Sequence, residues 1–308
     1  MTLPLLITPG DPDGIGPEVS VKAAKALGVA AILIGDVDAC RRWAPDLPVV
    51  EAIQPVDGLC AMQPPAGEPM EVAAVRLGAE ACLDKRASAL VTGPIHKERL
   101  VAQGFQYAGH TDLLGAICGR DPMMAFVGAG LRVGLVTAHI PLAKVPDAVD
   151  EARIEHCVRL CLDGLSQLEI DRKRVVLAGV NPHAGERGVL GLEEMERVGP
   201  VCERLREEGL DVVGPLAAES AFLALRQGQA DMLLAMYHDQ GLTPLKMVAF
   251  GELVNWSLGL PIVRTSVDHG TAYDIAGQGV ADPRSMEEAI RLALQLSASA
   301  GSTRSHGA

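Results

Sequence analysis

Three histidines stand directly after short apolar runs, and their type and placement suggest chemistry. His139 follows the run 131–138, His183 follows a run that ends at Gly179, and His238 follows the run 232–237. If these runs are strands of a parallel sheet, their carboxyl ends share the edge at which such sheets bind ligands. Three imidazoles can hold a divalent cation and leave one coordination position open. A histidine after a strand is also often a hydrogen-bonded structural residue, and the long spacings form no local motif, so both interpretations stand.

A second group combines hydroxyls, a lysine and glycines in two loop-like segments, 92–97 (TGPIHK) and 109–112 (GHTD). Both segments open onto expected helices. Backbone N–H groups at a helix start, together with hydroxyl and ammonium donors, suit an anionic oxygen cluster such as phosphate. The alternative is that Thr111 and Asp112 only cap a helix.

A third group lies towards the C-terminus and consists of Lys246, Asn255 and Arg264, followed by the polar run 265–274. Lys246 and Arg264 border apolar segments, where an unpaired cation is costly. They are therefore expected to meet anions. A buried salt bridge between Arg264 and Asp268 is the structural alternative.

The glycine-rich loops argue against a familiar nucleotide-binding motif. The segment 10–16 (GDPDGIG) follows the first expected strand, but it lacks the G-x-G-x-x-G pattern, and its two carboxylates would repel a pyrophosphate. No phosphate-binding P-loop and no nucleophile elbow is present. A nicotinamide cofactor would have to bind without a Rossmann fingerprint.

The elements that must position these residues alternate between strands and helices, which predicts an α/β protein with a mixed, mostly parallel sheet. Pro200 is expected to break or offset the helix in which it lies. We expect strands at 3–8, 30–35, 89–92, 123–127, 131–137, 174–178, 232–236, 254–258 and 262–264, and helices at 71–85, 150–168, 192–209 and 286–296.

The composition limits the class of protein. Of the 308 residues, 48% are hydrophobic and 21% charged, which excludes a disordered chain or a coiled coil. The net charge of −12 argues against a nucleic-acid partner. No apolar stretch is long enough to span a membrane, so no membrane partner is expected. The seven cysteines form no CxxC pair and are typical of free thiols in a reducing compartment, so we expect a cytoplasmic location.

Taken together, the motifs resemble the 4-hydroxythreonine-4-phosphate dehydrogenase family of vitamin B6 biosynthesis. The matching segments follow one another in the family's order over nearly the whole chain: ITPGDPDGIGPE, VTGPIHK, GHTDLL, TAHIPL, GVNPHAGERG, GPLAAES, MYHDQGLTPLK, VNWSLGLPIVRTSVDHGTAYDIAG and ADPRSMEEAI.

The resemblance implies a two-domain α/β/α sandwich similar to isocitrate and isopropylmalate dehydrogenases, with the active site in the interdomain cleft. We expect a discontinuous first α/β domain of residues 1–112 plus 272–308. A second α/β domain of residues 113–271 is expected to carry the dimer interface and most of the metal and substrate residues.

The resemblance also assigns the site residues. It implies one divalent metal (zinc, magnesium, cobalt or manganese) on His139, His183 and His238, shared between the subunits of a homodimer. Substrate contacts fall on His110, Thr111, Lys246, Asn255 and Arg264. Lys246 and the three histidines are the expected catalytic residues, with Lys246 acting as a proton relay or as electrostatic support for an alkoxide.

The activity that follows is metal-dependent oxidation of 4-phosphohydroxy-L-threonine by NAD or NADP. The product is a β-keto acid that decarboxylates to 3-amino-2-oxopropyl phosphate. Alternatives are oxidation of D-threonate or D-erythronate 4-phosphate, and an inactive small-molecule binding protein on the same scaffold. Two departures bear on this choice: Glu219 stands where the family usually has aspartate, and the region 37–69 is shorter than usual.

Overall fold

The computed structural model describes residues 3–302, which divide into two compact units. The first unit contains residues 1–122 and 251–308, and the second contains residues 123–250. These bounds differ from the expected domains, because residues 113–122 and 251–271 belong to the first unit. The reason is strand pairing: the two strands within 251–271 extend the sheet of the first unit.

The sheet of the first unit has the strand order β3-β2-β1-β4-β11-β10, parallel throughout except for the antiparallel pair β10–β11. Its four-residue parallel strands are β1 (Leu5–Thr8), β2 (Ala31–Ile34), β3 (Leu59–Met62), β4 (Ala89–Thr92) and β11 (Arg264–Val267), and β10 is Val254–Leu258. Its helices are α1 (Gly16–Leu27), α2 (Val37–Arg41), α3 (Met70–Leu83), α4 (Lys97–Ala102), α5 (His110–Cys118) and α11 (Arg284–Ser302).

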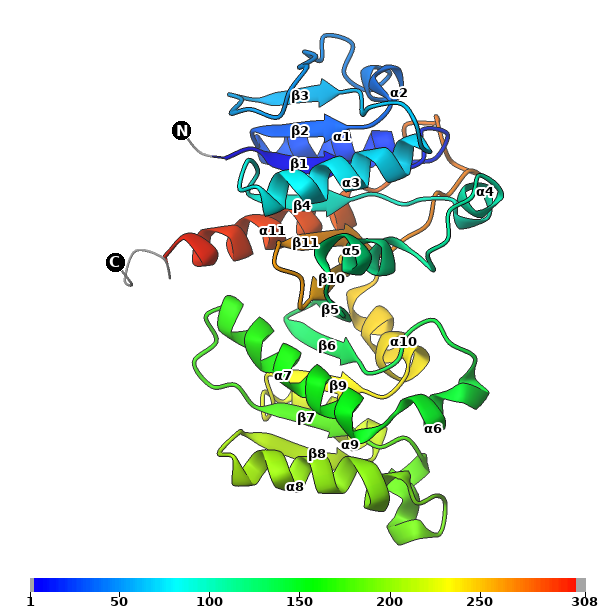
Figure 1. Ribbon diagram of the computed structural model, residues 1–308, viewed down its shortest axis with the longest axis vertical. Coiled ribbons are helices and arrows are strands. Elements are labelled where there is room, and N and C mark those ends of the chain that lie inside the picture. The colour runs from blue at the N-terminus through cyan, green and yellow to red at the C-terminus, as the bar shows by residue number, and fades with distance from the viewer. Residues whose placement is uncertain (1–2, 303–308) are drawn as a thin grey trace. The chain divides into compact units, whose positions relative to one another are not determined.

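Helices cover both faces of this sheet (Figure 1). α1 connects β1 to its neighbour β2, whereas α3 connects the edge strand β3 back to β4, in the opposite direction across the sheet. Right-handed crossovers place two such helices on opposite faces. α11 packs on β11, β4 and α1, and α5 packs on α3, which gives three layers. The strands are buried on both sides, so β1, β2 and β4 have no exposed position.

The strands of the second unit follow one another in the order β5-β6-β9-β7-β8, with one antiparallel pair, β5–β6. Its strands are β5 (Met123–Gly128), β6 (Leu131–Leu135), β7 (Val175–Ala178), β8 (Val212–Leu216) and β9 (Met232–Ala235). Its helices are α6 (Val145–Ala148), α7 (Glu151–Gln167), α8 (Gly199–Glu207), α9 (Ala218–Arg226) and α10 (His238–Ala249), with short turns η1 (Leu142–Lys144), η2 (Pro182–Gly188) and η3 (Glu194–Val198). α7 packs on β6, β7, β9 and α8, while α9 and α10 pack on β9. This unit is also an α/β/α sandwich, so the predicted fold class is confirmed.

The structure departs from the predicted elements at a few places. The expected helix 192–209 is a π-helical turn, η3, followed by α8, and Pro200 lies in the first turn of α8, where a missing N–H costs little. The expected strand 262–264 is instead β11, which runs to Val267. β3 and β8 were not predicted, because Pro and Gly surround the first and interrupt the second.

The loops after β1 and β4 lie directly against each other. Gly93 N–H donates to the Thr8 carbonyl at 2.7 Å, and Asp11 N–H donates to the Pro94 carbonyl at 2.9 Å. A Cβ on Gly93 would collide with the Pro9 carbonyl oxygen, so glycine is required there. This contact fixes the carboxyl edge of the sheet in the first unit, where the segment 92–97 begins.

Candidate functional site

Arg264 is the centre of a buried polar group in the first unit. It begins β11 level with Leu90 of β4, yet its guanidinium donates at 2.6 Å to the hydroxyl of Thr92, at the end of that strand. The side chain therefore extends towards the carboxyl edge of the sheet. It also donates to Ser257 Oγ of β10 at 2.9 Å, and it lies 3.3 Å from His110 Nδ1.

These partners are two hydroxyls and an imidazole, and none of them carries a negative charge. Arg264 is only 2% exposed, and burial lowers its pKa to about 9. The guanidinium of Arg264 does not form the salt bridge with Asp268 that was the structural alternative. A dehydrated cation held by neutral groups can be stabilised further by an anionic ligand.

Polar atoms of Arg264 and of residues close in sequence to its partners are buried and lack a hydrogen-bond partner in the described part of the chain. They are Arg264 Nε, Thr111 Oγ1, which follows His110, and Asn255 Oδ1, which lies two residues before Ser257 on β10. Unsatisfied buried polar atoms are rare in native proteins and indicate a missing water, ion or ligand. The alternative role of Thr111 as a helix cap is not seen, because α5 begins at His110 after Gly109, and its N-terminus has no side-chain cap.

His110 stands at the N-terminus of α5 between two cations. Burial, Arg264 and Lys97 together lower the pKa of His110 to about 3, so the ring is neutral at pH 7. A Cβ on Gly109 would lie 3.5 Å from the Lys97 ammonium, which places that charge beside the start of α5. Two cations, uncapped N–H groups and an unpaired hydroxyl form a set of donors suited to an oxyanion.

The sequence singled out His110, Thr111, Asn255 and Arg264, and the structure brings Arg264 and His110 into direct contact. Asn255 belongs to the same edge, because it is paired with Ser266 in the β10–β11 ladder. Thr92 was noted only within its segment, and Ser257 was missed. The sequence does contain a signal for Ser257, because a hydroxyl in a buried strand needs a hydrogen-bond partner on a neighbouring strand.

In the second unit, His139 and His238 come together because their strands are neighbours. Leu135 of β6 is paired with Ala235 of β9. Beyond the strands, the Thr137 hydroxyl donates to the Met236 carbonyl at 2.8 Å, which holds the two following loops together. The two imidazole centres lie 5.5 Å apart. Two imidazoles on one tetrahedral zinc, with metal–nitrogen bonds of about 2.1 Å, have centres roughly 5 Å apart, so this spacing fits a shared metal.

His183 follows β7, which is the other neighbour of β9, but the backbone that carries it has an unusual conformation. It begins a run of five residues, 183–187, that all have left-handed backbone angles within η2. Only Gly185 tolerates this freely, so the other four residues cost roughly 4–8 kcal/mol in total at about 1–2 kcal/mol each. Within residues 3–302, no three His, Cys, Asp or Glu side chains gather closely enough to hold a metal. The structure thus brings together two of the three expected ligands.

Lys246 and Glu219 lie on helices of the second unit. Lys246 is half-buried about two turns beyond His238 on α10, and Pro244 lies inside that helix. Glu219 is exposed in the first turn of α9, which follows β8. His238 also contacts its neighbour Asp239 through Nδ1 at 2.7 Å.

The loop 10–16 forms an internal ionic cluster that sequence reasoning did not foresee. Asp11 is fully buried, contacts Arg99 at 2.9 Å and accepts a hydrogen bond from the Tyr273 hydroxyl. Arg99 also pairs with Asp13 and Glu71. Burial and Asp11 raise the pKa of Tyr273 to about 12. The two carboxylates of the loop thus share a single guanidinium with Glu71 and keep a net negative charge, which supports the inference that this is not a pyrophosphate loop.

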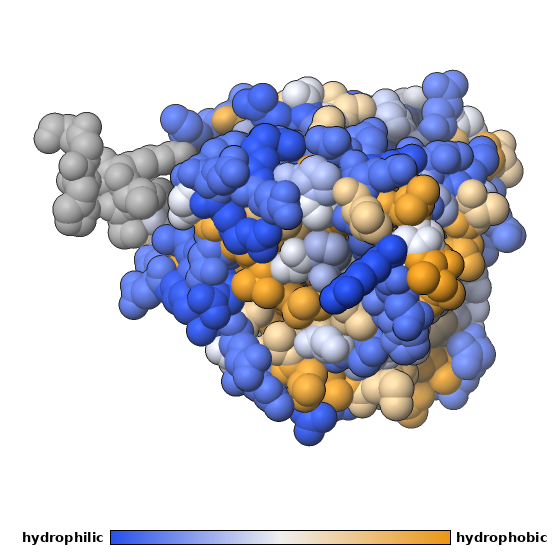
Figure 2. Space-filling model, turned by 90° about the horizontal axis from the view of Figure 1, so that it is seen from below, coloured by the Kyte–Doolittle hydropathy of each residue, from blue (hydrophilic) through white to orange (hydrophobic). Residues whose placement is uncertain are grey.

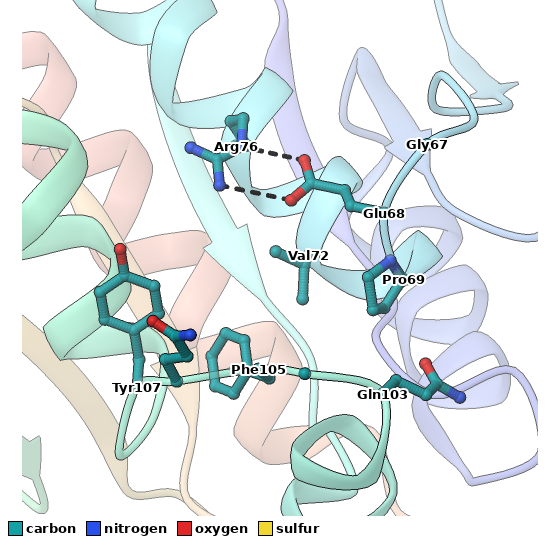
Figure 3. Close-up of a pocket in the computed structure, with 10 residues that line it drawn as sticks. Gly67, Glu68, Pro69, Val72, Arg76, Gln103, Phe105 and Tyr107 are labelled. Atoms are coloured by element: carbon teal, nitrogen blue, oxygen red, sulfur yellow. Dashed lines mark hydrogen bonds and ion pairs between the residues drawn. The ribbon is translucent and has the colours of Figure 1, made fainter.

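A separate pocket of about 320 Å³ lies between α3 and the loop before α5 (Figure 3). Its cation, Arg76, already donates two hydrogen bonds to the Glu68 carboxylate, at 2.9 and 3.3 Å. Phe105 and Val72 form its apolar part. Because its charge is balanced internally, this pocket has no need of an anion, in contrast to the Arg264 group.

The fold is that of a class of two-unit α/β/α sandwich proteins. Over 96% of this chain and 85% of the other, the structure resembles that of isocitrate dehydrogenase from Methylococcus capsulatus, with a TM-score of 0.51 and 18% identity. At that identity the likeness concerns the fold alone, and the predicted resemblance of folds is confirmed.

The chain belongs to the family described as pyridoxal phosphate biosynthetic protein PdxA, whose model matches residues 24–293. It is 41% identical to the 4-hydroxythreonine-4-phosphate dehydrogenase of Thioalkalivibrio sulfidiphilus, over 96% of this chain and 97% of that protein. A putative 4-hydroxythreonine-4-phosphate dehydrogenase from Salmonella typhimurium matches with a TM-score of 0.85 and 36% identity, over 96% of this chain and all of that one. A terephthalate 1,2-cis-dihydrodiol dehydrogenase from Burkholderia xenovorans matches less well, with a TM-score of 0.66 and 30% identity over 96% and 98% of the two chains. The predicted family is confirmed, and with it membership of a group of dehydrogenases.

No helix within the described residues has the length and apolarity to cross a bilayer.

Proposed function

We propose that the chain oxidises the secondary alcohol of 4-phosphohydroxy-L-threonine, with NAD or NADP as the hydride acceptor. The β-keto acid formed then loses CO₂ to give 3-amino-2-oxopropyl phosphate. The observation that carries the proposal is the buried Arg264 cation, whose partners are all uncharged and whose surroundings contain unpaired polar atoms. A phosphorylated substrate supplies the anion that such a group can bind.

In this proposal, Arg264, Asn255, Thr111 and the neutral His110 bind and orient the phosphate-bearing substrate in the first unit. Because His110 is neutral at pH 7, one ring nitrogen can accept a hydrogen bond while the other donates one. Lys246 in the second unit serves as the proton relay for the reacting hydroxyl, holding the proton at Nζ.

His139, His183 and His238 would hold the divalent metal, and the spacing of two of these rings fits a common ion. Such a cation supplies Lewis acidity, which lowers the pKa of an alcohol bound beside it. Zinc, magnesium, cobalt and manganese are the candidates. We also propose a cytoplasmic location, because all seven cysteines are free.

We further propose a homodimer, because the second unit exposes apolar side chains beside the turn that carries His183. Val189 is 76% exposed and Met195 is 58% exposed, and Met247 on α10 and Phe250 directly after it are each more than 80% exposed. Figure 2 shows hydrophobic side chains lying among hydrophilic ones on the face seen from below. Exposed apolar groups of this size are typical of interaction surfaces. A monomeric mass in light scattering at micromolar concentration would overturn this assignment.

The test of the activity is a substrate panel. Purified protein, a divalent metal and NAD⁺ or NADP⁺ are mixed with 4-phosphohydroxy-L-threonine, D-threonate 4-phosphate, D-erythronate 4-phosphate or their unphosphorylated forms. We expect reduced nicotinamide to form fastest with phosphohydroxythreonine and not with the unphosphorylated compounds. Faster turnover of a sugar-acid phosphate would assign the sister activity. Absence of turnover with every compound would favour an inactive binding protein.

A further inference from the structure

The turn that carries His183 is unusual because its backbone is strained although several of its side chains are exposed, so burial does not offset the strain. Residues 183–187 are all left-handed, yet His183, Glu186 and Arg187 are exposed. Strained backbone persists only where the surrounding structure imposes it, and it concentrates at functional positions. Something close by must therefore hold the turn in this form.

The group that holds it is a buried carboxylate. Glu194 is only 3% exposed, and its Oε1 accepts the backbone N–H of Asn181 at 2.7 Å. Its Oε2 accepts the side-chain amide of Asn181 at 3.0 Å. The Asn181 carbonyl in turn accepts the N–H of Ala184, at 3.1 Å, inside the left-handed run.

The carboxylate is also enclosed by the turn. A Cβ added to Gly185 would collide with Glu194 Oε2, and a Cβ added to Gly179 would lie 3.0 Å from Oε1. The carboxylate thus fits between the residue that ends the β7 run and the middle of the turn. It contacts both sides of His183 in the chain without being next to it in sequence.

Hydrogen bonds from one side chain connect the segment just before the turn to the loop that carries His238. Gln240, in the first turn of α10, donates from Nε2 to the Gly179 carbonyl at 2.7 Å. Its Oε1 accepts the N–H of Met236, at the end of β9, at 2.7 Å. The side chain of Gln240 therefore links the loop that carries His183 to the loop that carries His238 through hydrogen bonds.

We propose that Glu194, acting through Asn181, is a positioning residue that holds His183 in the left-handed turn needed for metal binding. This inference rests on the proposed function, in which His183 is a metal ligand. Groups that orient a metal ligand without touching the metal typically change metal affinity by about 10- to 100-fold when they are removed.

The test uses the full-length, metal-free protein and two readouts. Glu194→Gln keeps the shape of the side chain and removes its charge, and Asn181→Ala removes the amide donor without altering the buried carboxylate. Glu196→Gln is the matched control, because Glu196 is an exposed glutamate in the same η3 turn. The first readout is the rate of tryptic cleavage after the exposed Arg187, followed by mass spectrometry. The second is the affinity for Co²⁺ alone, measured by calorimetric titration.

We expect Glu194→Gln and Asn181→Ala to speed cleavage after Arg187 and to weaken Co²⁺ binding by about 10- to 100-fold, while Glu196→Gln changes neither. Adding Ala184→Gly to Glu194→Gln should restore part of the Co²⁺ affinity, because glycine adopts the left-handed conformation without strain. A purely structural role of Glu194 would not produce this rescue.

The outcomes separate this inference from the proposed function. If His183→Ala binds Co²⁺ as tightly as the wild-type protein, the metal assignment itself fails, and the positioning role fails with it. If Co²⁺ binding depends on His183 but Glu194→Gln and Asn181→Ala bind Co²⁺ normally, only the positioning role is overturned. Faster cleavage with unchanged Co²⁺ affinity also overturns the positioning role, since the turn is then held for a reason other than the metal.

Discussion

Replacing Arg264 with methionine tests the anion-binding group most directly. Burial lowers the pKa of Arg264 from 12.5 to about 9. A pKa difference of about 3.5 corresponds to about 5 kcal/mol against the charged form in the folded protein, at about 1.4 kcal/mol per pKa unit. The lowered pKa means that this cost is fully present below pH 9 and disappears as the pH rises from 9 towards 12.5.

Methionine removes that cost together with the hydrogen bonds to Ser257 and Thr92, which stabilise the protein by about 1.5 kcal/mol each. The ligand-free Arg264→Met protein is therefore expected to be more stable than the wild type by about 2 kcal/mol. A phosphorylated ligand at 100 times its Kd should stabilise the wild type by about 2.7 kcal/mol and leave the variant unchanged.

The assay is chemical unfolding at pH 7, with and without the phosphorylated substrate. Arg264→Lys is the control, because it keeps the charge but loses the planar pair of donors. If Arg264→Met loses about 3 kcal/mol or more without ligand, and the substrate still stabilises it, the guanidinium is a structural group and the reasoning is refuted.

The other predictions concern titration, backbone strain and thiol reactivity. The pKa of His110 falls from 6.5 to about 3 on folding, so between these pH values the unfolded chain binds a proton that the folded protein does not. Stability should therefore fall by up to about 5 kcal/mol as the pH drops from 6.5 to 3, and pH-dependent urea unfolding of His110→Asn should show a shallower fall. Ala184→Gly should stabilise the protein by up to about 1 kcal/mol in urea unfolding, since it relieves a left-handed alanine; a loss of stability would count against strain in the turn. Burial raises the pKa of the Cys40 and Cys82 thiols to about 12, so a thiol reagent such as DTNB should modify them only after unfolding; rapid modification of the native protein would contradict their burial.

Much of the fold follows from local pattern. The strands at 89–92 and 232–235 were predicted almost to the residue, because continuous apolar runs bounded by turns have few alternatives in an α/β chain. The same logic led to the histidines, since His139 and His238 follow adjacent strands.

What could not be predicted depends on contacts between distant segments. Nothing local links Glu194 to the backbone of Asn181, and the left-handed run 183–187 contains only one glycine to signal it. The bounds of the two units were also missed, because they depend on which strand β11 pairs with. Pairing across 170 or more residues is not visible in periodicity.

The discontinuous first unit has a consequence for synthesis on the ribosome. Residues 123–250 form the second unit from one uninterrupted segment, whereas the first unit lacks β10 and β11 until residues 254–267 have been made. Domains generally fold as units as the chain emerges, so the second unit should become protected first, although residues 3–122 of the first unit are made before it. Until then β4 presents an unpaired edge, and α11 is not yet there to cover it. Pulse-labelling hydrogen exchange on stalled nascent chains should find amides of β7 and β9 protected before those of β4.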